Sequence, residues 1–172
     1  TSSGDCTVLI EAAENASGSE PRLQLKGTNT SSNPIIEFGD SAAFPGSIEY
    51  ENSDNSMRIT TNASEAMRID SSGRLLVGST TEVTNTGGTG SLQVLGTGNS
   101  DTLLTIGRFS ANASPGTLAF TKSRNGTIGG NTIVQDDDNL GQIIFTASDG
   151  TDMLSLGAKI EAEVDGTPGS ND

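Results

Sequence analysis

The sequence predicts an all-β protein built from short stacked strands. One five-residue pattern, Gly-x-(Ile or Leu)-x-aromatic, occurs at Gly46–Tyr50, Gly116–Phe120 and Gly141–Phe145. In an extended strand the aliphatic and aromatic residues of this pattern fall on one face, because side chains alternate at a period of two. Gly, Pro, Asn and Ser interrupt the apolar runs every few residues, and no long segment has a clear helical period.

A longer repeat surrounds this pattern. Leu23–Thr28 recurs as Leu92–Thr97, 69 positions later, and Pro45–Ile48 recurs as Pro115–Leu118, 70 positions later. Because these anchors keep nearly one offset, the sequence predicts an internal duplication of about 70 residues with an indel of one residue.

The duplication suggests a division into modules. We expect a first β fibre module at 1–79, a Gly/Thr-rich linker or loop at 80–90, and a second β fibre module at 91–172. Modules of this kind stack along one axis. Equivalent anchors such as Ile48 and Leu118 are then expected in similar environments, because a one-residue slip would turn each strand face over.

Strands are expected where short apolar or alternating runs lie between turn residues. In the first module these are Thr7–Glu11, Leu23–Lys26, Ile35–Phe38, Ser47–Tyr50, Met57–Thr60, Ala66–Ile69 and Arg74–Val77. In the second they are Leu92–Leu95, Leu103–Ile106, Thr117–Thr121, Thr132–Val134, Gln142–Thr146 and Met153–Val164. The last segment alternates Ala and Ile with Lys and Glu, which favours a strand, although its Ala, Lys and Glu content leaves a helix as the alternative.

The composition is too polar for a large core. Only 31% of the 172 residues are hydrophobic and 3% aromatic, while 22 residues are glycine. Typical globular domains are about 45–50% apolar on a count that includes glycine. Such a chain is either disordered or buries its apolar residues against other chains. Because the apolar residues are clustered and periodic, we expect burial between copies of the chain.

Charge excludes two classes of partner. The net charge is −13, from 22 acidic and nine basic residues. A nucleic-acid backbone requires a basic surface, so nucleic acid is not expected as a partner. Anionic membrane surfaces are disfavoured for the same reason, and no apolar run of about 18 residues predicts membrane insertion.

No catalytic or cofactor chemistry is expected. The chain contains no His, and neither a phosphate-binding nor a dinucleotide-binding motif. Cys6 is the only cysteine, so it forms no intrachain disulfide. Asp136–Asn139 and Asp149–Asp152 are rich in oxygen ligands but lack the spacing of a calcium loop, and are expected to be solvated turns without metal. Paired carboxylates leave a polysaccharide-degrading fibre enzyme as a minor alternative, with no pair singled out.

The segment Asn55–Gly78 resembles the fibre repeats of bacteriophage tail fibres, especially those of marine and cyanobacterial phages. Similarity to the same group extends to Phe38–Asp40, Leu140–Gly150 and Val164–Gly169. The resemblance implies an elongated, homotrimeric, β-rich fibre of the triple β-helix or β-prism type on an extracellular virion. In many relatives a self-cleaving intramolecular chaperone domain follows such repeats and is removed after trimerisation.

The resemblance also implies a function and partners. The function is attachment to the bacterial host surface, and the partners are two identical chains, other tail proteins, and a glycan or protein receptor. It carries over no receptor-binding residues, which stay unknown. A cellular adhesin stalk or extracellular filament protein is the alternative.

Burial between copies also follows from the residues themselves. The side chains expected at contacts between copies are Ile48, Tyr50, Met57, Ile59, Met67 and Ile69. Asp in place of Ile48 or Leu118 is expected to break the trimer, because a buried unpaired charge costs several kcal/mol.

Overall fold

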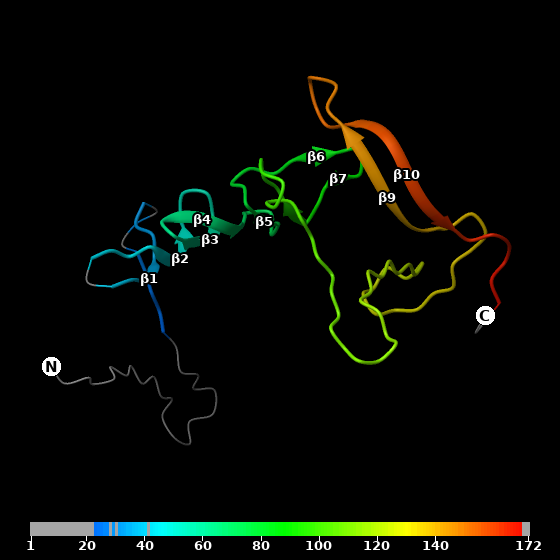
Figure 1. The fold of residues 1–172 in the computed structure, drawn as a ribbon, viewed down its shortest axis with the longest axis horizontal. Helices are drawn as coiled ribbons and strands as arrows, with labels where there is room; N and C mark the ends of the chain where they lie inside the picture. The colour runs from blue at the N-terminus through cyan, green and yellow to red at the C-terminus, as the bar shows by residue number, and fades with distance from the viewer. Residues whose placement is uncertain (1–22, 28, 30, 41, 170–172) are drawn as a thin grey trace, which may run out of the picture. The chain divides into compact units, whose positions relative to one another are not determined.

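The computed structural model describes residues 23–27, 29, 31–40 and 42–169, and every regular element among them is a strand. This confirms the all-β prediction, including a strand rather than a helix in the 153–164 segment. The expected strand Thr7–Glu11 and the single cysteine, Cys6, lie outside the described residues. The chain divides into two compact units between Ser71 and Ser72, and each is described by itself (Figure 1).

The first unit contains a four-stranded antiparallel meander. Its strands follow the chain order and are β1 (Ile35–Phe38), β2 (Gly46–Glu51), β3 (Ser56–Thr61) and β4 (Ser64–Ile69). Each contains the strand that the sequence predicts there. Asn62 and Ala63 make the tight β3–β4 turn with φ of 50° and 57°, a backbone twist that suits a two-residue hairpin.

The second unit contains a parallel pair and two hairpins. Its strands are β5 (Leu75–Val77), β6 (Thr84–Asn85), β7 (Gly88–Thr89), β8 (Leu92–Val94), β9 (Asn139–Ala147) and β10 (Ser155–Glu163). β5 pairs with β8 in parallel, and β9 forms a long antiparallel hairpin with β10. The polar 80–90 segment contains the small β6–β7 hairpin, whose Asn85 bridges to Met153.

A small core surrounds Leu76 in β5. Leu76 is 1% exposed and is the one buried hydrophobic residue among those described. Next to it in the sheet, the buried Gln93 uses its amide to hold the 80–90 segment. Its Oε1 accepts from the Val83 N–H at 2.9 Å, and its Nε2 donates to the carbonyl oxygens of Val83 and Gly90 at 3.1 and 3.2 Å.

Four expected strands are not strands of the single chain. They are Leu23–Lys26, Leu103–Ile106, Thr117–Thr121 and Thr132–Val134. Ile48 therefore lies in β2 while its sequence equivalent Leu118 lies in no strand, so the expectation of matching environments is not met within one chain. The physical reason is pairing: β2 lies between β1 and β3, whereas residues 117–121 have no strand beside them in the described part of the chain.

Candidate interaction surface

One face of the β1–β4 meander is apolar. Residues opposite one another in an antiparallel pair share a face, and the register places Ile36 opposite Ile48, Ile48 opposite Ile59, and Ile59 opposite Met67. Following this register across the sheet defines the apolar face as Ile36, Phe38, Ile48, Tyr50, Met57, Ile59, Met67 and Ile69. It contains all six side chains that the sequence predicts at contacts between copies.

No second layer covers this apolar face among the described residues. Phe38 is 54% exposed, Ile69 47%, Met57 40% and Ile48 39%. A sheet becomes stable when its apolar face packs against another element, so a single layer is half of a domain core. The missing half must come from outside the described part of the unit.

The β9–β10 hairpin repeats this arrangement in the second unit. Ala158 lies opposite Phe145, Ile160 opposite Ile143, and Ala162 opposite Gly141, which makes these six residues one apolar face. The charged side chains of β10 lie on the other face, where Lys159 and Glu161 form an ion pair. Phe120 packs beside Gly141 on this face, but Phe145 and Ile160 are still more than half exposed, so most of the face is open as well.

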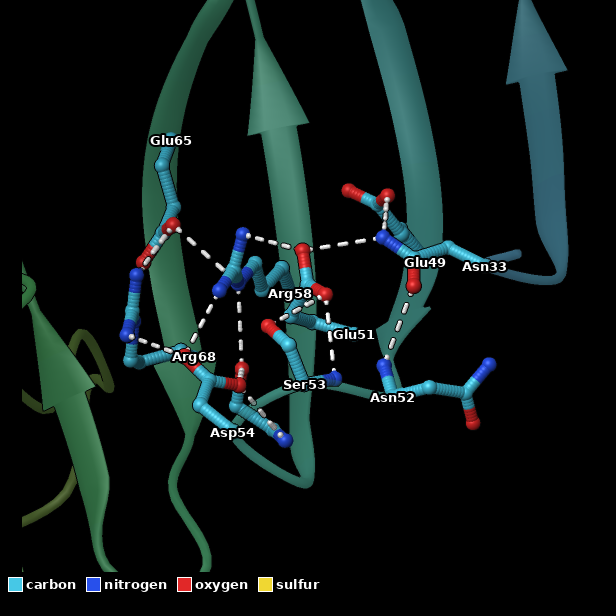
Figure 2. A network of polar contacts seen from close by, with 10 residues as sticks. Asn33, Glu49, Glu51, Asn52, Ser53, Asp54, Arg58, Glu65 and Arg68 are labelled. Atoms are coloured by element: carbon cyan, nitrogen blue, oxygen red, sulfur yellow. Dashed lines mark hydrogen bonds and ion pairs between the residues drawn. The ribbon is translucent and has the colours of Figure 1, made fainter. Parts of the chain in front are cut away.

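The opposite face of the first meander carries an ionic network, defined here as Glu51, Asp54, Arg58, Glu65 and Arg68. Figure 2 shows Arg58 of β3 at its centre, between Glu51 of β2 and Glu65 of β4. Arg58 lies 3.1 Å from Glu51, 2.7 Å from Asp54 and 3.8 Å from Glu65 between charged atoms. One guanidinium therefore joins three consecutive strands and a turn.

Arg68 supplies the second cation of the ionic network. It contacts Glu65 through two parallel hydrogen bonds of 2.5 and 2.6 Å, and Asp54 at 3.5 Å. The hydrogen bond to Glu65 is the main reason that the pKa of Arg68 is raised. Such bidentate pairs fix geometry as well as charge, so Arg68 orients Glu65 within β4, and its contact with Asp54 links β4 to the β2–β3 turn.

Hydrogen bonds lower the pKa of two carboxylates of the ionic network, those of Glu51 and Asp54. The Ser53 hydroxyl donates to Glu51 and is the largest cause of that residue's lowered pKa, which Asn33 lowers further. The Ser56 hydroxyl does the same for Asp54. Every buried side-chain polar atom in the described part of the chain has a partner. The buried polar atoms of the network are thus satisfied by neighbouring residues of the same unit, as expected of a structural element.

A second ion pair closes the loop before β9. The Arg124 guanidinium donates two hydrogen bonds to Asp138, at 2.6 and 2.9 Å, and the Gln135 N–H donates a third at 2.9 Å. These bonds lower the pKa of Asp138 to about 2, with Arg124 as the largest cause. The Asp138 carbonyl also accepts from the N–H of Val164, so the pair lies where the loop meets the end of β10.

Arg124→Gln is expected to raise the pKa of Asp138 from about 2 toward its ordinary value of 3.8. A lowered carboxylate pKa contributes stability that is present above the unfolded value and is lost as the pH falls through the folded value. The wild-type loop should therefore open between pH 3.8 and about 2. Carbon-13 NMR titration of the Asp138 carboxyl measures this. An unchanged Asp138 pKa in the variant would contradict the assignment, and Arg108→Gln serves as the control.

The two acidic turns named from the sequence are built by internal hydrogen bonds. In the first, Asp138 is paired with Arg124, and Asp136 accepts from the N–H of Gly166 at 2.6 Å. In the second, Asp149 accepts from the N–H groups of Thr151 and Asp152. The described residues contain no cluster of three or more candidate metal ligands. Nor do they include a helix of the length and apolarity needed to cross a membrane.

The ionic network was not anticipated from the sequence. The pattern Met-Arg-Ile occurs twice, at 57–59 and 67–69, and each places an Arg between two apolar residues. Alternation alone puts Arg58 and Arg68 on the face opposite the apolar residues, and the register pairs them directly. Two neighbouring cations require carboxylates nearby, so the repeated Met-Arg-Ile pattern is the sequence signal for this network.

No family model, curated protein or solved structure matches this chain.

Proposed function

We propose that this chain is a structural and adhesive segment of a bacteriophage tail fibre, in which three identical copies assemble through their apolar sheet faces. The observation that carries the proposal is the pair of single-layer sheets, each with an open apolar face. Leu76 is the one buried hydrophobic residue among those described, so the described part of a single chain lacks the core that a stable domain needs.

The distribution of charge supports identical copies as the partner. The apolar face of β1–β4 contains no ionisable carboxylate or cation, and the ionic network occupies the opposite face. Apolar faces can therefore meet around a symmetry axis without bringing the charges of a −13 chain together. The acidic outer surface then keeps a long assembly soluble.

The resemblance of Asn55–Gly78 to tail-fibre repeats supports the virion as the location. This segment forms β3, β4 and β5, and so contains half of the apolar face and most of the ionic network. Host attachment, contacts with other tail proteins and a bacterial glycan or protein receptor follow from that resemblance as parts of the proposal.

Four measurements test the proposed function. Light scattering on the purified chain should give three times the chain mass, and a compact monodisperse monomer would contradict assembly. Antibodies against the chain should label fibres on intact phage particles, and the purified assembly should reduce adsorption of those particles to their host. Labelling of filaments on cells instead of virions would overturn the phage assignment in favour of a cellular filament. Glycan cleavage by the purified assembly would favour the fibre enzyme.

A further inference from the structure

Residues 117–121 have the sequence of a strand but no partner strand among the described residues. The pattern of Gly116–Phe120 matches Gly46–Tyr50 in β2 and Gly141–Phe145 in β9, and both of those segments are strands. Leu118 is 60% exposed and Phe120 54%. The amide of Ala119 donates no hydrogen bond to any described residue. The backbone of this segment is therefore free to pair, and its apolar side chains remain more than half exposed.

One edge of β10 is also available. β10 pairs with β9 on one side, and no described strand lies along its other side. Upstream, Asn85 bridges to Met153 and the Thr86 hydroxyl donates to the Leu154 carbonyl at 2.6 Å, but this pairing stops before Ser155. All nine residues of β10 are exposed. A long edge of unpaired N–H and C=O groups is a template for another strand.

The two elements match in their side-chain pattern. In an extended 117–121 segment, Leu118 and Phe120 share one face. On β10 the apolar face presents Ala158, Ile160 and Ala162, so small residues leave room beside the large side chains of an added strand. On the other face, Thr and Ala of the segment would lie beside Lys159, Glu161 and Glu163 and add no charge.

Phe120 is already seated on the apolar face of its own hairpin. A Cβ atom on Gly141 would lie 2.6 Å from the Phe120 Cβ, so the ring packs where glycine leaves space. It borders an apolar hollow that is also lined by Ile143 and Ile160. No backbone hydrogen bond joins residues 117–121 to β10, which pairs with β9 alone among the described strands. The segment therefore does not pair with its own β10.

We propose that residues 117–121 of one copy add as a strand to the free edge of β10 in a neighbouring copy. Phe120 stays against Gly141 of its own chain while its backbone pairs with the neighbour. The apolar face of one hairpin then meets the apolar face of the neighbour's extended sheet, which provides the second layer that each hairpin lacks. The inference depends on the proposed assembly of identical chains and specifies where two copies exchange strands.

Hydrogen exchange on the full-length wild-type assembly tests the pairing. In a sample shown by light scattering to be a trimer, the amides of residues 117–121 should exchange at least about 100-fold more slowly than those of the exposed turn at 110–114. Fast exchange at 117–121 in a confirmed trimer would overturn the strand pairing and leave the proposed function intact. A wild-type chain that stays monomeric would overturn both.

Proline substitution gives an independent test. Ala119→Pro removes an N–H that bonds no described residue of its own chain but that an added strand requires. The variant should fail to form trimers, whereas Ala113→Pro in the neighbouring turn should assemble normally. Ala119→Val, which suits a strand, should also assemble. Trimers of Ala119→Pro equal in yield to wild type would overturn the inference.

Discussion

Replacing Ile48 with Lys is expected to leave the protein monomeric. Ile48 lies at the middle of the apolar face, opposite Ile36 on one side and Ile59 on the other. In the proposed trimer the substitution buries an unpaired ammonium in every copy, at a cost of several kcal/mol each. Light scattering on the purified variant measures the outcome. Lys lowers the net negative charge of the chain. A loss of assembly would therefore result from the charge placed on the apolar face and not from added repulsion between acidic chains.

Ile35→Lys is the matched control for Ile48→Lys. Ile35 is the same residue type with nearly equal exposure, 41% against 39%, and it lies opposite Glu49 on the charged face. A Lys there gains a carboxylate neighbour and stays at the outer surface of the proposed assembly. Ile35→Lys should therefore assemble like wild type. Trimers of Ile48→Lys, or equal loss of assembly in both variants, would contradict the assignment of the two faces.

Arg58→Met is expected to destabilise the protein by about 1–3 kcal/mol at neutral pH. Removing the central guanidinium leaves Glu51, Asp54 and Glu65 close together, with Arg68 as the one remaining cation of the ionic network. Met keeps much of the side-chain volume, so the lost stability measures the contribution of the charge and the hydrogen bonds of Arg58. Denaturant unfolding at fixed protein concentration measures it. Arg108→Met is the control, because Arg108 is exposed and bonds Asn112 alone among the described residues.

The cost of Arg58→Met should shrink in acid. The lowered pKa values of Glu51 and Asp54 contribute stability above their ordinary values of 4.5 and 3.8, and this stability is lost as the pH falls below them. In the variant the same carboxylates repel one another at neutral pH, and protonation relieves that repulsion. The two unfolding curves should therefore converge toward pH 3. A difference that is equal at pH 7 and pH 3 would show that Arg58 stabilises the sheet by packing.

Much of the strand structure follows from the sequence. Period-two alternation placed β1 to β4 within a residue or two of their ends, because the register of a sheet with one apolar face is strongly specified. The same alternation assigned β10 correctly against the helical propensity of its Ala, Lys and Glu residues. It also identified six residues of the apolar face before the register was known.

Pairing is what the sequence alone did not determine. Gly46–Tyr50 and Gly116–Phe120 share one pattern, yet the first is a strand and the second is not. Local alternation specifies which face a side chain takes, but a strand also needs a neighbour for its N–H and C=O groups. The meander supplies that neighbour for Ile48 within the chain, and the described second unit supplies none for Leu118.

The ionic network likewise depended on the tertiary structure. Alternation by itself determined that Arg58 and Arg68 lie away from the apolar residues. Only the antiparallel register brings Glu51 of β2 and Glu65 of β4 to the same guanidinium, because these residues are separated along the chain and meet when the strands fold back. The period of the side chains is a local property, and the sequence alone determines it. Contacts between strands depend on which strands the turns bring together, and only the tertiary structure decides this.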